Sequence, residues 1–108
     1  MFARHVSVVL KPNCVDEFNR TIKDEVIPLL RMQKGFKEEI TLVALNGTEA
    51  VAISLWDQKE DPATYYQTIY PQVLEFLAKV IEGTPEVKTY EATNSTYHKI
   101  AARAAAGS

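Results

Sequence analysis

The stretch ITLVALNGTEAVAISLW, residues 40–56, decides the fold of this 108-residue chain. Two apolar segments, residues 40–45 and 50–56, flank Asn46-Gly47, a dipeptide typical of a tight hairpin turn between antiparallel strands. Neither segment alternates between apolar and polar residues, as a strand with one solvated face would. We therefore expect a β-hairpin whose strands are apolar on both faces and need cover on both sides.

Strand and helix patterns surround this hairpin. In chain order, the sequence predicts a strand over residues 2–10, a helix from Asn13 to Gly35, hairpin strands over 36–45 and 50–56, a helix from Asp61 to Gly83 and a strand over 87–96. Because proline lacks a backbone donor, Pro28 should kink the first helix and Pro71 should kink or break the second. Gly83-Thr84-Pro85 should stop the second helix.

This order of elements, βαββαβ, is that of the ferredoxin-like fold. The right-handed crossover rule then gives an α+β domain with an antiparallel four-stranded sheet and both helices on one face. We expect one such domain over residues 1–98, followed by an alanine-rich C-terminal tail over residues 99–108.

The second face of the sheet needs cover that the helices do not supply. An exposed apolar sheet favours aggregation, and a chain of this length has no spare element for it. We expect a homodimer in which two sheets face each other. The alternative is a monomer that uses its tail as a lid.

Composition excludes several classes of function. Twelve Lys and Arg residues against 14 Asp and Glu residues give a net charge of −2, which lacks the basic excess of a nucleic-acid-binding domain. Cys14 is the only cysteine, and the two histidines, His5 and His98, are far apart in sequence, so neither a disulfide nor a metal site is expected. The chain has no phosphate loop or dinucleotide fingerprint, and we expect no cofactor.

Targeting signals are also not visible. No stretch approaches the ~20 apolar residues of a membrane helix. The N-terminal residues lack the basic and apolar regions of a signal peptide. We therefore expect a cytoplasmic protein that does not contact membranes.

Residues 35–39, GFKEE, lead into the hairpin, and residues 54–57, SLWD, precede a second helix that contains Tyr65-Tyr66. With these features residues 2–96 resemble the antibiotic biosynthesis monooxygenase type of dimeric α+β barrel. The resemblance implies a pocket in each subunit between the sheet and the helices. Members of that family include cofactor-independent quinone-forming monooxygenases and haem-degrading enzymes.

The haem-degrading branch is disfavoured for this chain. Its members use a histidine from the second-helix region to bind iron, and residues 61–81 contain no histidine. The resemblance therefore points to chemistry without haem.

Two aromatic residues are the candidate catalytic groups. His5 is the only natural general base near neutral pH on a predicted core element, although a histidine among apolar neighbours can also be structural. Trp56 ends the third strand, where its indole N–H could orient a substrate oxygen and its ring could form a pocket wall. Packing between the strand and the second helix is an equally open role for Trp56.

Three further residues are candidate substrate contacts. Tyr66 and Tyr70 form an i, i+4 pair on the second helix, which could line the pocket or belong to an amphipathic surface. Asn94 shares one face of the last predicted strand with Tyr90 and could reach the pocket or a partner subunit.

The leading functional hypothesis is a cofactor-independent monooxygenase-like enzyme for a small aromatic, phenolic or quinol substrate. A phenolate can pass an electron to dioxygen itself, so the protein needs a dry apolar pocket, a base and a hydrogen-bond donor. The first alternative is a non-catalytic or stress-response barrel that binds a small apolar or aromatic ligand. A second alternative is an interaction module whose sheet exists only to dimerise.

Overall fold

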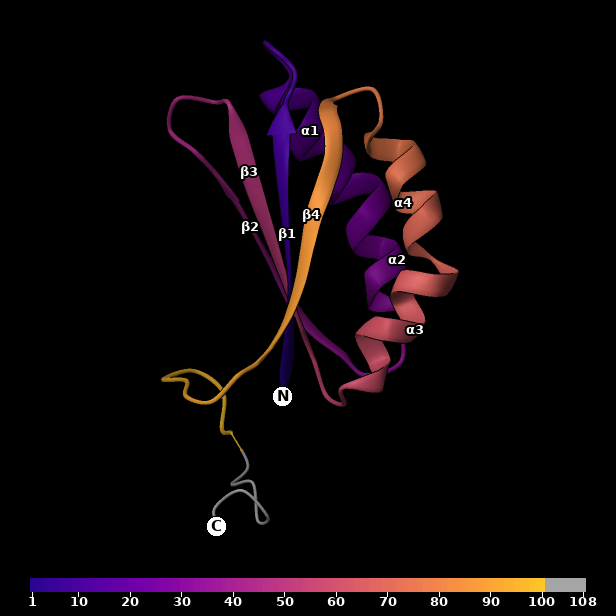
Figure 1. Ribbon diagram of the computed structural model, residues 1–108, viewed down its shortest axis with the longest axis vertical. Coiled ribbons are helices and arrows are strands. Elements are labelled where there is room, and N and C mark those ends of the chain that lie inside the picture. Colours follow the sequence, from indigo (N-terminus) through magenta and orange to yellow (C-terminus); the bar gives the residue numbers. More distant parts are fainter. Residues whose placement is uncertain (101–108) are drawn as a thin grey trace.

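The computed structural model of the chain describes residues 1–100, and it shows one four-stranded sheet with its helices on one side (Figure 1). The predicted tail over residues 99–108 lies, from residue 101 onward, outside the described residues. The elements are β1 (Phe2–Leu10), α1 (Val15–Thr21), the π-helical turn η1 (Ile22–Val26), α2 (Ile27–Arg31), β2 (Phe36–Val43), β3 (Glu49–Trp56), α3 (Glu60–Thr68), α4 (Tyr70–Leu77) and β4 (Ile81–Glu91).

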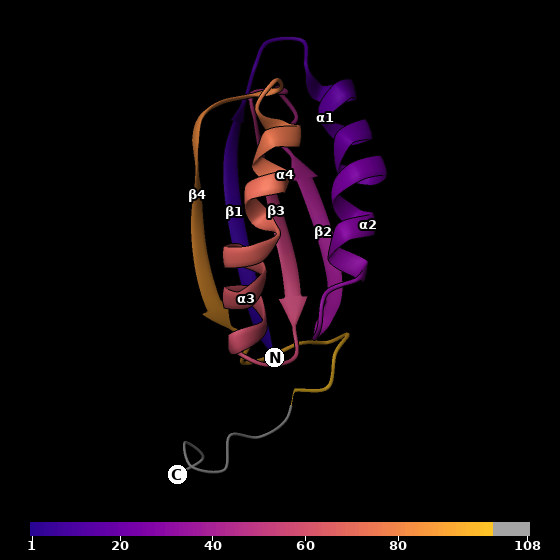
Figure 2. The ribbon, with the colours of Figure 1, turned by 90° about the vertical axis from the view of Figure 1, so that its right-hand side faces the viewer.

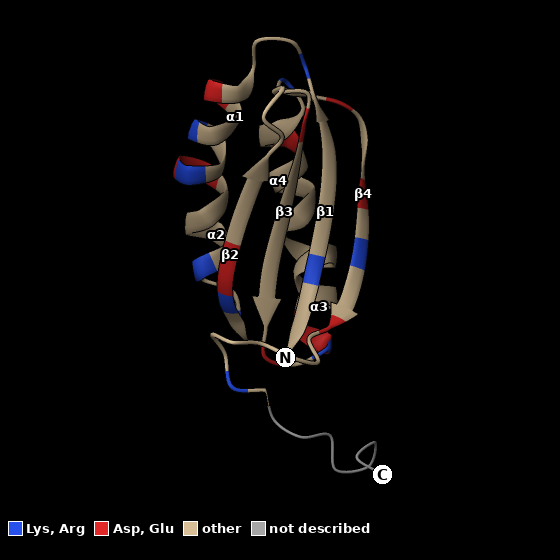
Figure 3. Ribbon diagram, turned by 90° about the vertical axis from the view of Figure 1, so that its left-hand side faces the viewer, with Lys and Arg blue, Asp and Glu red and all other residues tan. Residues whose placement is uncertain are grey.

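The sheet has the strand order β2-β3-β1-β4, and its three strand pairs are antiparallel. The helices form a second layer over one face (Figure 2), and within residues 1–100 the other face carries no helix (Figure 3). The predicted α+β ferredoxin-like fold is therefore confirmed. Residues 44–48 connect β2 and β3 in a hairpin, as the Asn46-Gly47 dipeptide predicted, and the N–H of Gly47 donates to the carbonyl of Ala44 to close the turn.

The first helical segment contains a π-helical turn just before Pro28. Within it the N–H of Ile27 donates to the carbonyl of Ile22, five residues earlier. Pro28 has no N–H to donate and its ring crowds the carbonyl of residue 24, so a wider turn relieves the clash. The irregularity expected at Pro28 thus takes the form of a π turn.

The second helical segment breaks at Ile69, between α3 and α4, and Pro71 occupies the first turn of α4. The helix ends earlier than predicted, at Leu77, and β4 begins at Ile81 instead of residue 87. Residues 83–85, predicted to stop the helix, instead form an irregularity inside β4. The register with β1 shifts there, from Ser7 to Val9, because proline cannot donate to the ladder and Gly83 adopts φ +68°.

Alternation along the strands sends one set of side chains under the helices and the other to the open face. In β1, Val6 and Val8 are buried, whereas His5 and Ser7 on the opposite face are half-buried. The helices close the core with apolar and aromatic side chains: Phe18, Ile22, Val26, Leu30, Tyr65, Tyr70, Val73 and Leu77.

After β4 the chain crosses beneath the sheet toward β2 (Figure 3). His98 ends this crossing with a contact from its Nε2 to Oε1 of Glu38 on β2. Among residues 1–100, no helix is long and apolar enough to cross a membrane.

Candidate functional site

One row of residues across the helix-covered face of the sheet is polar. Ser54 on β3 pairs with Arg4 on β1 on one side and with Glu39 on β2 on the other, and Arg4 pairs in turn with Thr89 on β4. Adjacent strands lie about 4.8 Å apart, so Arg4 and Glu39 are separated by about 10 Å of sheet. The row therefore places a cation, a hydroxyl and a carboxylate at regular intervals beneath the helices.

The flanking rows are apolar at their centres, and each ends in one polar residue, Glu91 on β4 or Thr41 on β2. Toward the strand ends nearer α3, Trp56 pairs with both Phe2 and Phe36. On the opposite side, Val6 pairs with Ala52. The polar row thus lies in an apolar setting, where electrostatic interactions are stronger than in water.

Arg4 is the most unusual residue of the row. Its side chain is only 3% exposed, and its guanidinium carbon lies 4.1 Å from the ring centre of Tyr70, 5.2 Å from that of Tyr65 and 5.5 Å from that of Tyr66. These cation–π contacts are favourable, but they do not replace hydrogen bonds to a cation removed from water. The Nη2 atom is buried and has no hydrogen-bond partner among the described residues.

The tyrosines around Arg4 form a connected group in which Tyr66 stacks on Tyr70 at 5.5 Å between ring centres. Burial raises the pKa of Tyr65 to about 12, and Arg4 opposes that rise. Burial also raises the pKa of Tyr70, and both the charge of Arg4 and a hydrogen bond between Arg4 and the Tyr70 hydroxyl oppose that rise. Tyr65 and Tyr70 consequently stay protonated at neutral pH and can donate hydrogen bonds, but they cannot act as bases.

Glu39 is the carboxylate of the row. Its Oε2 atom accepts a hydrogen bond of 2.6 Å from the hydroxyl of Thr41. Burial raises the pKa of Glu39, and the Thr41 hydrogen bond partly opposes the rise. A carboxylate with a raised pKa holds a proton more readily, which suits it to proton transfer with a weakly acidic group.

Ser54 links the row to Trp56, the residue at the end of β3. The indole Nε1–H of the fully buried Trp56 donates to Oγ of Ser54 over 2.8 Å. The hydroxyl of Ser54 accepts this bond and keeps its own proton free to donate. Trp56 also packs its ring against Tyr65 at 5.4 Å between centres, so it supports the tyrosine group from behind.

Two hollows meet at Arg4. The inner cavity, about 40 Å³, lies between the sheet and the helices, and its lining includes Arg4, Glu39, Ser54, Tyr65 and Tyr70. The outer cleft, about 390 Å³, lies between the start of α3 and β4 and is lined by Arg4, Lys59, Pro62, Ala63, Tyr66, Val87 and Thr89. The inner cavity has room for a water molecule but not for an aromatic ring, whereas the outer cleft has the volume of a small-molecule site.

The structure does not bring His5 to this site. His5 lies on the open face, where it pairs with Ile53 and Lys88 and packs edge-on against Tyr90. Strand alternation instead turns its neighbour Arg4 under the helices. A role for His5 as a base stays a prediction that would place the reaction on the open face.

The other sequence candidates divide between the site and the surface. Tyr70 lines the inner cavity and Tyr66 the outer cleft, so the predicted pair meets at Arg4. Trp56 lies behind Tyr65, with its indole N–H already bound to Ser54. Asn94 lies beyond the end of β4, where it is exposed and its side chain donates to the hydroxyl of Thr93, so the strand predicted to carry it toward the pocket ends too early.

Sequence reasoning missed Arg4, Glu39 and Ser54. A signal for Arg4 was available, because it shares the strand face of the buried Val6 and Val8. Since the hairpin strands are apolar on both sides, however, alternation there does not reveal which face the helices cover. The sequence therefore did not show that Glu39 and Ser54 lie on the face that the helices cover.

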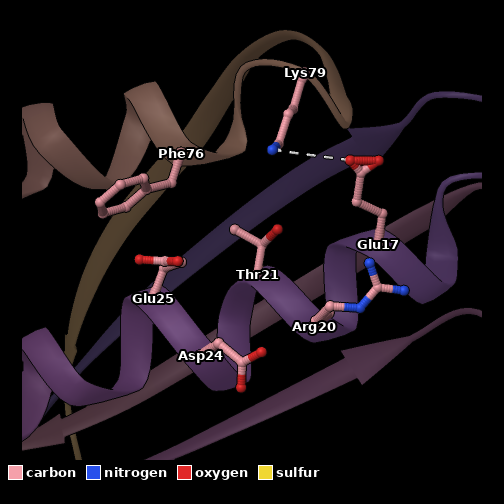
Figure 4. A pocket seen from close by; sticks show the side chains of 7 residues that line it. All are labelled: Glu17, Arg20, Thr21, Asp24, Glu25, Phe76 and Lys79. Carbon is pink, nitrogen blue, oxygen red and sulfur yellow. Dashed lines mark ion pairs between the residues drawn. The ribbon is translucent and has the colours of Figure 1, made fainter.

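Another hollow lies outside the core, between α1–η1 and α4 (Figure 4). Its volume is about 190 Å³, and its lining is charged: Glu17, Arg20, Asp24 and Glu25 come from α1 and η1, and Lys79 follows α4 (Figure 4). Lys79 and Glu17 form an ion pair of 4.0 Å with both side chains substantially exposed. Surface charges of this kind are solvated, whereas the Nη2 atom of Arg4 is buried without a hydrogen-bond partner among the described residues.

No protein-family model matches the sequence, and no curated protein does. Solved structures do match its fold. The monooxygenase ActVA-Orf6 of Streptomyces coelicolor, in complex with the ligand nanaomycin D, aligns with a TM-score of 0.75. The alignment has 14% identity and covers 91% of this chain and 92% of the other. SnoaB, a cofactor-independent oxygenase from Streptomyces nogalater, aligns at 0.74 with 13% identity over 90% and 97%.

A further structure, of an antibiotic biosynthesis monooxygenase, aligns with a TM-score of 0.70 and 14% identity over 87% of this chain and 100% of its own. The chain thus has the fold of an antibiotic biosynthesis monooxygenase-like domain. The resemblance seen in the sequence is confirmed at that level.

Proposed function

We propose that the protein is a monooxygenase-like enzyme that oxidises a small phenolic or quinol substrate at the helix-covered face of its sheet. The observation that carries the proposal is the buried guanidinium of Arg4, with its unpartnered Nη2, in the same polar row as the carboxylate of Glu39. The oxygenases of like fold support the class of chemistry, because their names describe the same reaction type.

The residues of the row suit the activation of a phenol. Glu39 would accept the phenolic proton, and the charge of Arg4 together with the hydroxyl of Ser54 would stabilise the resulting phenolate. The electron-rich phenolate would then transfer an electron to dioxygen, and the two radicals would combine at the ring carbon. One oxygen atom stays as the new quinone oxygen, and the other leaves as water with the hydrogens of the phenol and of that carbon.

This reaction needs no external reductant. Conversion of the phenol to a quinone removes four electrons from the substrate, and reduction of dioxygen to one carbonyl oxygen and one water consumes four. The protein would therefore contribute proton transfer, charge stabilisation and exclusion of water, while the substrate supplies the electrons.

Substrate entry requires side chains to move, because the inner cavity of about 40 Å³ is smaller than a phenol ring. Arg4 separates the inner cavity from the outer cleft, and Tyr66 and Tyr70 hold it by stacking interactions. A ligand that pairs with Arg4 would replace these contacts. The movement of Arg4 would then join the two hollows.

The test is oxygen consumption by the purified protein with a panel of monophenols and hydroquinones, with quinone formation followed by absorbance. Arg4→Met and Glu39→Gln should each reduce turnover by at least about 100-fold, the scale of one lost acid–base or electrostatic contribution. His5→Asn separates the two faces: it should leave turnover unchanged if the reaction occurs beside Arg4. A loss with His5→Asn and none with Glu39→Gln would contradict the proposed site.

A non-catalytic ligand-binding protein is the second candidate. The observation in its favour is that Trp56 already donates its N–H to Ser54 and that the core around it is closed. Under this hypothesis, phenols bind to the pocket but consume no oxygen above the background rate. Binding measured alongside oxygen uptake distinguishes the two functions.

We also propose that two copies pair through the open faces of their sheets. Ile40 and Leu42 on β2 are each 50% exposed, and Val9 on β1 is 52% exposed, although they lie on regular strands. Ile53 lies at the centre of this face, between His5 and Ile40. A second sheet would bury this apolar surface and complete the barrel that the family resemblance implies.

A further inference from the structure

The outer cleft between α3 and β4 has the charge of an anion-binding site. Two of its lining side chains, Arg4 and Lys59, are cationic, and none is acidic. Glu60, which follows Lys59 in the chain, is exposed and does not line the cleft, and the buried Asp61 accepts the backbone N–H of Gln58 over 3.0 Å. A local pair of cations is notable in a chain whose net charge is −2.

Arg4 gives this cleft a buried group that lacks a partner. Its guanidinium is almost fully buried among three tyrosine rings, and Nη2 makes no hydrogen bond within residues 1–100. Removing a cation from water without an anion is strongly unfavourable. An anionic ligand that enters from the cleft would supply the missing partner, in the bidentate geometry that guanidinium groups favour.

The rest of the lining favours an aromatic ligand over a free inorganic anion. Pro62, Ala63 and Val87 are apolar, and the ring of Tyr66 offers a stacking surface. Lys59 is exposed at the start of α3, where its flexible chain can reach a charge at the mouth of the cleft. The cleft therefore combines an apolar and aromatic lining with two cations.

We propose that the cleft binds the carboxylate of an aromatic acid through Arg4 and Lys59, with the aromatic ring against Tyr66 and Pro62. The carboxylate site stands on the cleft alone. The identity of the substrate, a hydroxyaryl carboxylic acid, rests on the proposed function. The several N–H groups of the Arg4 guanidinium can hold the carboxylate on the side of the cleft, because Arg4 lines both the cleft and the inner cavity that Glu39 lines.

Binding without turnover tests the proposal. Calorimetric titrations under nitrogen would compare 4-hydroxybenzoate and 3-hydroxy-2-naphthoate with their neutral amides, and with inorganic phosphate. Each acid should bind at least about tenfold more tightly than its amide, since one charge-assisted contact is lost in the amide. Added salt should weaken the acid and leave the amide unchanged.

Variants locate the site. Arg4→Met should abolish the preference for the acid, and Lys59→Met should weaken acid binding about threefold to tenfold with no effect on the amide. Lys79→Met, in the separate hollow between α1 and α4, is the matched control and should change neither. Circular dichroism shows whether each variant folds, and Lys59→Met, at an exposed position, keeps the test valid if Arg4→Met does not.

Equal affinity for acid and amide, no acid binding at millimolar concentration, or phosphate binding as tightly as the acids would each overturn the proposal. So would acid binding that Lys59→Met leaves unchanged. Acid binding with no oxygen uptake would refute the proposed oxygenase function alone. Turnover of neutral phenols without a preference for acids would refute the carboxylate site alone.

Discussion

The guanidinium carbon of Arg4 lies 4.1 Å from the ring centre of Tyr70, and no carboxylate pairs with it in the described part of the chain. Cation–π contacts with Tyr65, Tyr66 and Tyr70, each worth up to about 2 kcal/mol where desolvated, offset part of the cost of burying the charge, but no anion offsets the rest. The position of Arg4 therefore reduces stability while it prepares a site for an anion, a balance typical of functional residues.

Replacement of Arg4 should reveal this balance. Arg4→Met keeps a long side chain among the tyrosines and removes the buried charge, so we expect the free energy of unfolding to rise by about 1 kcal/mol and the melting temperature by about 4 °C or more. Calorimetry measures the change. Arg20→Met, at an exposed position of α1, is the control and should shift the melting temperature little. A clear fall with Arg4→Met would mean that its aromatic contacts outweigh its desolvation.

Glu39 should make stability depend on pH in the opposite direction from a salt-bridged carboxylate. Because burial raises its pKa above the ordinary value of 4.5, the folded state binds the proton more tightly than the unfolded state. Below about pH 4.5, Glu39 is protonated in both states and does not lower the stability of the wild type. As the pH rises from there through the folded-state pKa, the wild type loses stability. Glu39→Gln should therefore be more stable than the wild type at neutral pH, and the difference should shrink in acid.

Melting temperatures of both proteins from pH 4 to pH 8 check this sign. Glu75→Gln, an exposed change on α4, controls for the general effect of removing a negative charge. The opposite result would be a Glu39→Gln variant whose stability relative to the wild type is lower at neutral pH than in acid. It would show that the fold stabilises the charged carboxylate.

Some elements of the fold could be predicted from the sequence, and others could not. Local chemistry was sufficient for the hairpin turn at Asn46-Gly47 and for the strand-helix order, because each depends on neighbouring residues. The start of β4 was not predictable in this way. Val80 and Ile81 continue the helical spacing of α4, yet they belong to the turn and to the strand, and a bulge absorbs Gly83.

The site depends on which face the helices cover, and that is a property of the whole sheet. Arg4 and His5 are neighbours on one strand and point to opposite faces, so the face that the helices cover decides which of them lies in the site. His5 is the more natural base by its chemistry, but packing turns Arg4 inward. The row that joins Arg4, Ser54 and Glu39 comes from three strands, and only their register brings it together.

Ser54 should contribute more to the free energy of unfolding than its small side chain suggests. Ser54→Ala removes the acceptor of the Trp56 indole N–H and leaves that donor buried and unpaired, which costs about 1–3 kcal/mol. Urea denaturation measures the loss. A double-mutant cycle with Trp56→Phe isolates the bond: Ser54→Ala should cost clearly less when the indole N–H is already gone. Equal costs in both backgrounds would mean that the hydrogen bond contributes nothing to stability.

The open sheet face should determine the oligomeric state. Ile53 lies at its centre and is half-buried in the single chain, so Ile53→Lys can fold as a monomer but places a charge where a second sheet would pack. We expect a dimer for the wild type and a monomer for Ile53→Lys at low micromolar concentration by analytical ultracentrifugation. Thr64→Lys, at an exposed position of α3, is the control and should stay dimeric. A monomeric wild type would contradict the paired sheets.

Gly35 should be the glycine least tolerant of a side chain, because it holds the start of β2 against the start of α3. Its φ is +78°, and an added Cβ would lie 1.8 Å from Oδ2 and 2.4 Å from Cγ of Asp61. Asp61 is buried and bonded to the N–H of Gln58, so it cannot move away without loosening the turn that leads into α3. Gly35→Ala should thus combine backbone strain with displacement of Asp61, and we expect a loss of about 3 kcal/mol.

Gly83→Ala provides the matched comparison. Gly83 has a similar φ of +68°, but nothing lies within 4 Å of an added Cβ, so only the strain of about 1 kcal/mol remains. Urea denaturation of both variants gives the difference. Because α3 carries Tyr65 and Tyr66, Gly35→Ala should also weaken ligand binding beside Arg4, and Gly83→Ala should not. Equal losses of stability would show that Asp61 yields freely and that the strain at the glycine accounts for the whole effect.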